Sequence, residues 1–234
     1  LTINSFHHIL NEQYLQETIK KAPKTKPEVV VYGSTALDIY GSIERLPETE
    51  ENMYVEETGR YPGGMGANVA VALARLGVPT AFVGKIGSDH PSGLLLENLH
   101  KNNVDISNVT IARLNSLQTL ILTAGEGKRW LLTLGSPSAA MSLTSPTEID
   151  WNMARESRII YIGEVFIEVA SVLASFAEAQ GKTVVYRPGT PYLRLGVEKI
   201  HDVLEHTDIF ILNHVGWTIL QETSKEKLET PADL

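Results

Sequence analysis

Short runs of β-branched and aromatic residues alternate along this chain with stretches at helical spacing, and this alternation restricts the fold more than any other feature. The runs are VVVYG (29–33), TAFVGKIG (80–87), RIIYIG (158–163), TVVYR (183–187) and DIFIL (208–212). The helical stretches between them are 66–76, 91–102, 165–180 and 195–206. Apolar strands separated by helices are typical of βαβ units, whose parallel sheet is covered on both faces. The sequence therefore predicts an α/β fold with a doubly wound, mostly parallel sheet.

Two inserts and an N-terminal extension interrupt this alternation. Residues 39–61 and 117–134 predict shorter strands, and the second insert predicts a hairpin that turns at Gly125-Glu126-Gly127. We expect these strands to form a small β lid over one end of the core. Residues 1–27 predict a helix followed by a polar, proline-containing linker. The expected organisation is a helical extension at 1–27 and an α/β domain at 28–234.

The composition favours a protein that acts on small molecules. A hydrophobic content of 43% is sufficient for a sizeable core, and no apolar run is long enough for a membrane helix. The N-terminus lacks the pattern of a signal peptide and the chain has no cysteine, so we expect a cytoplasmic protein. A net charge of −8 without a cluster of basic residues argues against a nucleic-acid partner. The seven histidines are adjacent or scattered, so we expect no metal site formed by the protein alone.

A glycine cluster opens an alanine-rich helix in the stretch PGGMGANVAVALARLG (62–77), at Gly63, Gly64 and Gly66. Glycines let a ligand approach backbone N–H groups, and the start of a helix carries the positive end of its dipole. Asn68 adds a donor and an acceptor, which suits a ligand rich in hydroxyl groups. A tight turn between strand and helix is the alternative explanation. A dinucleotide fingerprint would stand directly after the first strand, where GSTALD (33–38) occurs instead.

A single carboxylate, Asp38, stands at the end of the first predicted strand region. Open α/β sheets bind ligands beyond the carboxyl ends of their strands, so Asp38 is a candidate for binding a ligand. A turn or cap residue is the alternative, because aspartate is common at both positions.

The stretch GGMGANVAVALARLGVPTAFVGKIG (63–87) resembles the first signature of the ribokinase-like carbohydrate kinases, the PfkB family. The similarity extends over most of residues 28–220 and includes IYIGEV (160–165) and DIFILN (208–213). It implies a ribokinase-like fold with a β lid. It also implies transfer of the γ-phosphoryl group of ATP, with Mg²⁺, to a hydroxymethyl group of a sugar or nucleoside.

The resemblance also assigns roles to individual residues. The substrate hydroxyls would be held by Asp38, Gly64 and Asn68, with Gly63 leaving room for their approach. Glu164 would help to order the substrate or an ion, although a carboxylate at a helix N-terminus is the alternative. Asn213 matches the start of the family's Asn-x-x-Glu motif and would lie near Mg²⁺ and the phosphates, although a simple N-cap is the alternative.

Several substitutions depart from the family pattern. In NHVG (213–216), Gly216 replaces the glutamate of the motif and removes a carboxylate linked to magnesium. Met65 stands where ribokinase carries lysine, and Arg187 stands where ribokinases usually have asparagine, a position near ATP and Mg²⁺. Arg187 could bind a phosphate or carboxylate through paired hydrogen bonds, or it could form a surface ion pair.

The largest departure is the absence of the second signature, Asp-Thr-x-Gly-Ala-Gly-Asp, which supplies the anion hole and the aspartate base. Only residues 214–234 follow Asn213, so we expect the base beyond Leu234 and the C-terminal ATP-binding part outside this chain. The full-length protein is then a kinase, and these residues alone are nearly inactive. The alternative is a non-catalytic sugar- or nucleoside-binding or regulatory protein. The open strand edges of the lid could also pair two copies into a homodimer.

Overall fold

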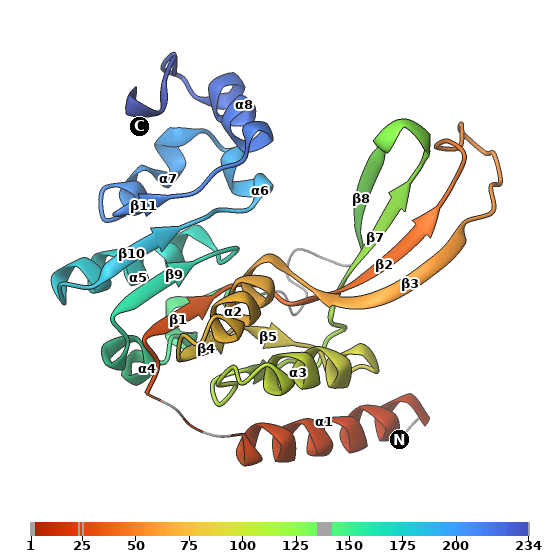
Figure 1. Cartoon of the computed structure of the whole chain (residues 1–234), viewed down its shortest axis with the longest axis horizontal. Helices are drawn as coiled ribbons and strands as arrows, with labels where there is room; N and C mark the ends of the chain where they lie inside the picture. The colour runs from red at the N-terminus through yellow and green to blue at the C-terminus, as the bar shows by residue number, and fades with distance from the viewer. Residues whose placement is uncertain (1–2, 23, 25, 135–141, 234) are drawn as a thin grey trace.

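A five-stranded parallel sheet forms the centre of the molecule in the computed structural model, which describes residues 3–22, 24, 26–134 and 142–233 and the side chains from residue 12 onward (Figure 1). Its strands are β1 (Val29–Tyr32), β4 (Thr80–Val83), β9 (Ile159–Ile162), β10 (Thr183–Tyr186) and β11 (Ile209–Phe210). Their order across the sheet is β11-β10-β9-β1-β4. All five lie within the predicted runs, and every pairing is parallel, which confirms the predicted parallel sheet.

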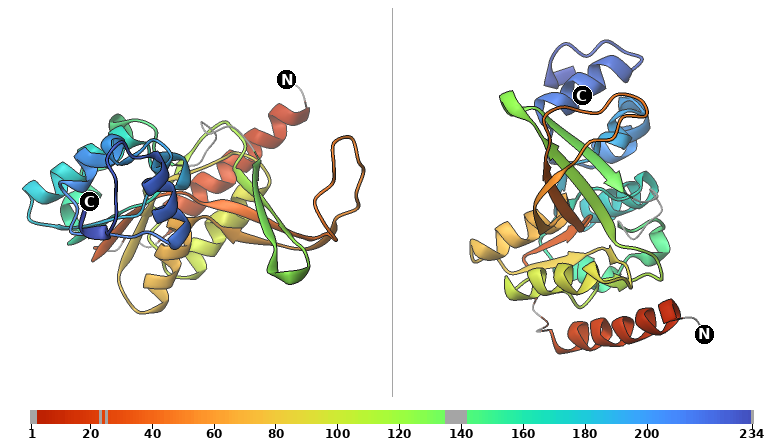
Figure 2. Two further views of the ribbon diagram at one scale, coloured as in Figure 1. Left: turned by 90° about the horizontal axis from the view of Figure 1, so that it is seen from above. Right: turned by 90° about the vertical axis from the view of Figure 1, so that its right-hand side faces the viewer.

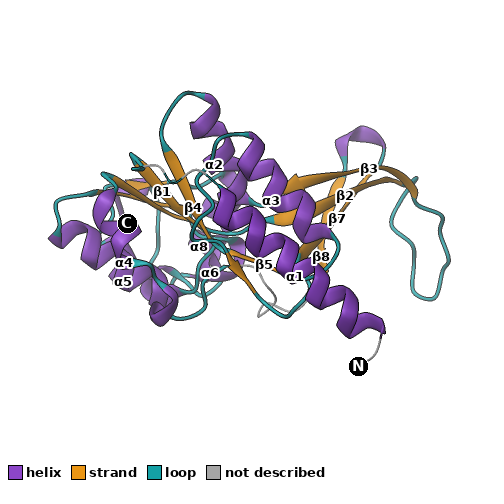
Figure 3. Cartoon of the chain, turned by 90° about the horizontal axis from the view of Figure 1, so that it is seen from below, coloured by secondary structure: helices purple, strands orange, loops and turns teal. Residues whose placement is uncertain are grey.

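Helices cover both faces of this sheet. One face carries α1 (Ile3–Lys21), α2 (Met65–Arg75) and α3 (Pro91–Lys101), which Figure 3 shows from below. The other carries α4 (Trp151–Glu156), α5 (Ile167–Ala179), α6 (Thr190–Leu193), α7 (Val197–Leu204) and α8 (His214–Thr223). Successive residues of β1 alternate between the two cores, with Val29 and Val31 in the first and Val30 and Tyr32 in the second. The doubly wound arrangement is therefore confirmed.

The predicted helices agree with α2, α3, α5 and α7 to within two residues at each end. The sequence did not indicate α4 or α6, because neither is long enough to show a helical period. Local signals fix them instead: the Asp150 carboxylate accepts from the Asn152 N–H at 2.8 Å, and Pro191 occupies the first turn of α6. Among the helices that the structure describes, none combines the length and apolar character needed to span a bilayer.

A second sheet, the lid sheet, projects from the core (Figure 2). It has the order β3-β2-β7-β8 and consists of β2 (Ala36–Ser42), β3 (Glu56–Gly63), β7 (Leu117–Thr123) and β8 (Arg129–Leu134). The predicted hairpin turn at Gly125–Gly127 joins β7 to β8. The first pair of strands extends beyond the predicted limits of 39–61, because β2 already pairs with β7 at Ala36. Asp38 therefore lies inside a lid strand and not at the end of the first core strand.

Two short strands, β5 (Lys85–Ile86) and β6 (Thr110–Ile111), form a small parallel sheet beside β4. The chain passes from β6 into lid strand β7 through residues 112–116. The Asp89 carboxylate holds this connection by accepting from the Ser116 N–H at 2.8 Å and from the Ser116 hydroxyl at 2.7 Å. The core is thus tied to the point at which the chain enters the lid sheet.

The N-terminal helix α1 packs against α3 at the outer edge of the core (Figure 1). Leu15 and Ile19 are buried in this contact. Tyr14 is exposed, and its hydroxyl donates to Glu97 Oε1 at 3.3 Å. The helix is thus joined to the core by burial in its C-terminal half.

We expect the Leu15→Ala substitution to lower the free energy of unfolding by about 2–5 kcal/mol, because the side chain is fully buried and its removal leaves a cavity. Urea unfolding followed by circular dichroism measures the change. Gln16→Ala, at the next and exposed position of the same helix, should change stability by no more than about 0.5 kcal/mol. Equal stability of Leu15→Ala and the wild type would show that α1 adds nothing to the core.

Candidate functional site

The glycine cluster forms the connection between lid strand β3 and α2. Gly64 begins the helix with a φ of 92°, and a Cβ atom there would lie 2.6 Å from the Cα of Thr35. A Cβ atom on Gly66 would lie 2.8 Å from the Cα of Gly33. The first turn of α2 is therefore in direct backbone contact with the loop that leaves β1. The close turn proposed as the alternative is present, and it brings the start of the helix to the carboxyl end of the sheet.

Gly63 leaves the space in which the Asp38 carboxylate lies. Asp38 is on β2, and a Cβ atom on Gly63 would collide with its carboxylate group. Burial raises the pKa of this carboxyl, while the charge of Arg129 and a hydrogen bond from Thr119 lower it. Thr119 is the β7 partner of Asp38 in the lid sheet. The arrangement places a half-buried carboxylate, able to accept hydrogen bonds from hydroxyl groups, directly beside the glycine turn.

Glu164 connects three segments that are distant in sequence. It follows β9, and its Oε2 atom accepts from the Ser34 hydroxyl and, at 3.4 Å, from the Ser34 N–H. The Gly66 N–H in the first turn of α2 also donates to this carboxylate. Burial raises the pKa of Glu164, although these hydrogen bonds and the charge of Arg187 lower it. Glu164 thus joins the ends of β1 and β9 to α2, and it does not cap the helix that follows it, which begins at Ile167.

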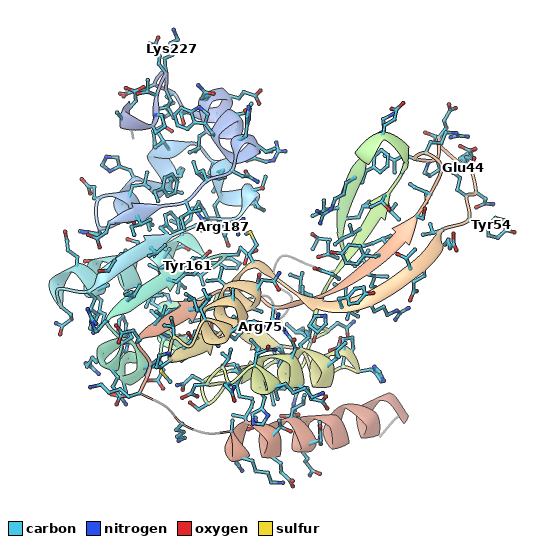
Figure 4. All side chains as sticks on the ribbon, viewed as in Figure 1. Glu44, Tyr54, Arg75, Tyr161, Arg187 and Lys227 are labelled. Carbon is cyan, nitrogen blue, oxygen red and sulfur yellow. The ribbon has the colours of Figure 1, made fainter. Side chains whose placement is uncertain are left out.

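Arg187 lies at the carboxyl end of β10, on the side of the core that faces the lid sheet (Figure 4). Its backbone N–H donates to the Ile162 carbonyl at 2.9 Å, and its guanidinium donates to the Met65 sulfur. It forms no ion pair with any carboxylate in the described part of the chain, so the alternative of a surface ion pair has no support there. Two of the three substituted positions of the family pattern, Met65 and Arg187, are therefore in contact with each other.

Asn213 begins α8, and its side-chain oxygen accepts from the Gly216 N–H at 2.8 Å. This is the N-cap that the sequence left open as an alternative. The amide oxygen is engaged in the cap, and Gly216 offers no carboxylate, so residues 213–216 do not fit a Mg²⁺ site by themselves. Across the described residues, an exposed group on α7 (His201, Asp202 and Glu205) is close enough to share a cation. Exposed acidic groups are common without an ion, and we assign no metal to it.

The structure brings together most of the predicted site residues. Asp38, Gly63 and Gly64 meet at the glycine turn, and Glu164 is bonded to the same turn through Gly66. Asn68 is exposed one helical turn further along α2. Asn213 follows a strand next to β10 and is occupied by its own helix cap.

Sequence reasoning missed two polar residues of this region, Ser34 and Tyr161. Ser34 lies in the GSTALD stretch directly after β1, so its position after a buried strand was an available signal. Tyr161 gave a weaker signal as the one aromatic residue in the aliphatic strand β9, and its proximity to Arg187 depends on the pairing of β9 with β10.

A parallel α/β core with a projecting lid sheet and a carboxylate beside a glycine turn defines the ribokinase-like class of proteins. The structure of ribokinase from Arabidopsis thaliana complexed with ribose and ATP superimposes with a TM-score of 0.69 at 23% identity, covering 88% of this chain and 66% of that one. The family model of the pfkB family carbohydrate kinases matches residues 26–234, and the chain belongs to this family.

Curated relatives agree with this assignment. Ribokinase from Staphylococcus aureus (strain COL) is 30% identical over 165 residues, which cover 69% of this chain and 54% of that protein. Probable fructokinase-7 from Arabidopsis thaliana is 29% identical over 167 residues, which cover 68% of this chain and 47% of that protein. The chain thus spans about half the length of these relatives.

We expect Glu164→Gln to alter the pH dependence of stability. Because burial raises the pKa of Glu164 in the folded state, the folded protein retains this proton at a pH where the unfolded chain has released it. This carboxyl therefore makes the free energy of unfolding fall as the pH rises from the ordinary glutamate pKa through the raised one. Glutamine lacks this proton equilibrium, so the difference between variant and wild type should shift in favour of the variant as the pH rises. Urea unfolding at several pH values from acid to neutral measures it, and parallel curves would contradict the expectation.

Proposed function

We propose that this chain forms the acceptor-binding part of an ATP-dependent kinase that phosphorylates a hydroxymethyl group of a sugar or nucleoside. The observation that carries the proposal is the Asp38 carboxylate seated against Gly63 at the start of α2, at the base of the lid sheet. A carboxylate in this position can accept hydrogen bonds from two neighbouring hydroxyl groups. Similarity to a ribokinase and a fructokinase supports a sugar as the acceptor. We propose a cytoplasmic location for the protein.

The residues around the turn have complementary roles in this proposal. Asp38 accepts hydrogen bonds from the acceptor hydroxyls, and Asn68 adds a donor and an acceptor from α2. Gly63 and Gly64 let the ligand approach the backbone where a side chain would block it. Glu164 holds the loop after β1 against α2 and so fixes the turn. The lid sheet excludes water from the reacting groups.

We propose ATP as the phosphoryl donor, bound at the carboxyl edge of the sheet near Asn213. Residues 213–216 supply no carboxylate for Mg²⁺, so we assign the metal to no residue of this chain. Phosphoryl transfer also needs a base that accepts the hydroxyl proton, and we assign this role to none of the residues that the structure describes. A non-catalytic sugar- or nucleoside-binding protein is the second candidate, and it shares the same acceptor site.

We expect Asp38→Asn to weaken sugar binding, because the amide replaces a charged acceptor with a neutral one. A ligand at about 100 times its dissociation constant should stabilise the folded chain by about 2.7 kcal/mol. Loss of the charge-assisted hydrogen bonds should make the free energy of binding less favourable by about 1.5–3 kcal/mol. This corresponds to a roughly 10- to 100-fold weaker affinity. Thermal-shift and calorimetric titrations with ribose, fructose and adenosine measure the change.

Glycine substitutions provide the matched control for this experiment. Gly63→Ala should weaken the same ligand, because its methyl group displaces the Asp38 carboxylate. Gly125→Ala, in the lid hairpin with open space around it, should leave binding unchanged. Binding that is unaffected by both Asp38→Asn and Gly63→Ala would place the acceptor elsewhere. Phosphorylation of the bound sugar by ATP, tested with the chain and with any longer form of the protein, separates the kinase from the non-catalytic candidate.

We also propose that two copies of the chain pair through their lid sheets. Within the described residues, strand β8 is at the edge of the lid sheet and pairs only with β7. Three of its leucines are largely exposed: Leu131 at 60%, Leu132 at 44% and Leu134 at 46%. An open strand edge that carries apolar side chains favours pairing with another strand.

We expect the wild-type protein to have the mass of a dimer in solution, and the double substitution Leu132→Lys/Leu134→Lys to produce a monomer. The two lysines lie on one face of the edge strand, where charge opposes pairing. Light scattering coupled to gel filtration measures both masses. Val172→Lys, at an exposed apolar position on α5, is the control and should leave the mass unchanged. A monomeric wild type would contradict the proposal.

A further inference from the structure

The Arg187 guanidinium has no strong acceptor in the described part of the chain. Its backbone is fixed by the bond from its N–H to the Ile162 carbonyl, and its side chain reaches across to Met65, the first residue of α2. The Met65 sulfur is a weak acceptor, whereas the guanidinium has five N–H donors. Glu164 acts on Arg187 through its charge, but forms no ion pair with it. Most of the donors of Arg187 therefore remain available to a ligand.

A second donor lies beside it. Tyr161, on the neighbouring strand β9, is only 5% exposed, and its hydroxyl has no hydrogen-bond acceptor among the described residues. Burial raises the pKa of this hydroxyl, although the charge of Arg187 and a hydrogen bond with the Arg187 side chain lower it. The charges of Arg187 and Glu164 both act on the hydroxyl, which places it within the same group of side chains. Arg187 can only donate to this hydroxyl, so its own O–H proton has no acceptor among the described residues. A buried donor without an acceptor is costly, so its retention indicates an acceptor supplied by a ligand.

The helix start adds to this concentration of positive charge. Met65 opens α2, an eleven-residue helix whose N-terminus carries the positive end of the dipole. The Arg187 guanidinium and the Tyr161 hydroxyl thus lie beside a helix N-terminus. Among the described residues, no carboxylate forms an ion pair with this guanidinium. Phosphate and carboxylate groups are the ligands that match such a group of donors.

We propose that Arg187, Tyr161 and the start of α2 bind an oxyanion of the acceptor substrate, which is therefore a sugar phosphate or a sugar acid. The inference rests on the proposed function and names the substrate class of its acceptor site. The contact of Arg187 with Met65 puts the oxyanion next to the glycine turn and Asp38, on the acceptor side. Asp38 then binds hydroxyl groups of the same molecule, and Arg187 binds its charged end.

The test compares neutral and anionic ligands on the wild type and four variants. Calorimetric titrations use ribose, fructose 6-phosphate, gluconate and ATP as probes, because fructose 6-phosphate and gluconate each carry an oxyanion and keep a free hydroxymethyl group. Arg187→Met removes the charge but keeps a long side chain against Met65, and Arg187→Lys keeps the charge without the planar fork. Tyr161→Phe removes the buried hydroxyl alone. Arg75→Met, at an exposed arginine in the last turn of α2, is the matched control.

We expect fructose 6-phosphate or gluconate to bind the wild type more tightly than ribose. Arg187→Met should lower the affinity for that anionic ligand roughly 10- to 100-fold, because the charge-assisted hydrogen bonds are lost. The affinity for ribose, which forms no such bond with Arg187, should not change. Arg187→Lys should recover part of the affinity. Tyr161→Phe should also weaken the anionic ligand but not ribose, which keeps the proposal testable if Arg187→Met does not fold. Preference for phosphate over carboxylate, or the reverse, identifies which oxyanion the site accepts.

Three results would overturn the inference. If Arg187→Met lowers the affinity for ribose and for the anionic ligand equally, Arg187 has only a packing role. If Arg187→Met weakens the binding of ATP alone, Arg187 binds the phosphates of the phosphoryl donor and not the acceptor. If neither anionic sugar binds the wild type, the proposed oxyanion site does not exist. In each case, ribose binding that depends on Asp38 would leave the proposed function standing, whereas absence of binding by every sugar and nucleoside would overturn the proposed function as well.

Discussion

The backbone contact between Gly33 and Gly66 determines where every other part of the site lies. A side chain at either position would strike the Cα atom of the other at less than 3 Å, so only two glycines allow α2 to begin against the end of β1. With the helix in this position, the Ala67 N–H reaches the Ser34 carbonyl at 2.9 Å. The turn before the helix then returns the chain to the lid sheet at Gly63. The core, the helix start and the lid strand therefore meet at one point.

A buried carboxylate maintains this junction at an energetic cost. Glu164 is held by Ser34 and by the Gly66 N–H, yet burial raises its pKa, so these bonds do not fully compensate for the water it has lost. A residue selected for stability alone would not have this property. Perturbed carboxylates concentrate at functional sites, and the position of Glu164 between the glycine turn and Arg187 agrees with that tendency.

The regular part of the fold could be predicted because each strand of the core is an uninterrupted apolar run, and each long helix lies between two of them. The position of Asp38 could not be predicted in this way. Its place in the sequence suggested the end of a core strand, but β2 is defined by its pairing with β7, about 80 residues away, and local sequence holds no record of that pairing. The proximity of Met65, Tyr161 and Arg187 could not be predicted for the same reason. The elements that carry them, α2, β9 and β10, are brought together only by the order of the strands in the sheet.

The departures from the family pattern change the charge of the site in different directions, and Met65 removes a positive charge where ribokinase carries lysine. Gly216 removes a negative charge where the family motif has glutamate, and Arg187 adds a positive charge where ribokinases usually have asparagine. Both residues follow neighbouring strands, β11 and β10, at the carboxyl edge of the sheet. The chain as a whole carries a net charge of −8, and the Glu164 carboxylate lies close enough to Arg187 for their charges to interact. At this edge, Arg187 offers a planar guanidinium in contact with the start of α2, and such a group recognises an anion by the geometry of paired hydrogen bonds as well as by charge.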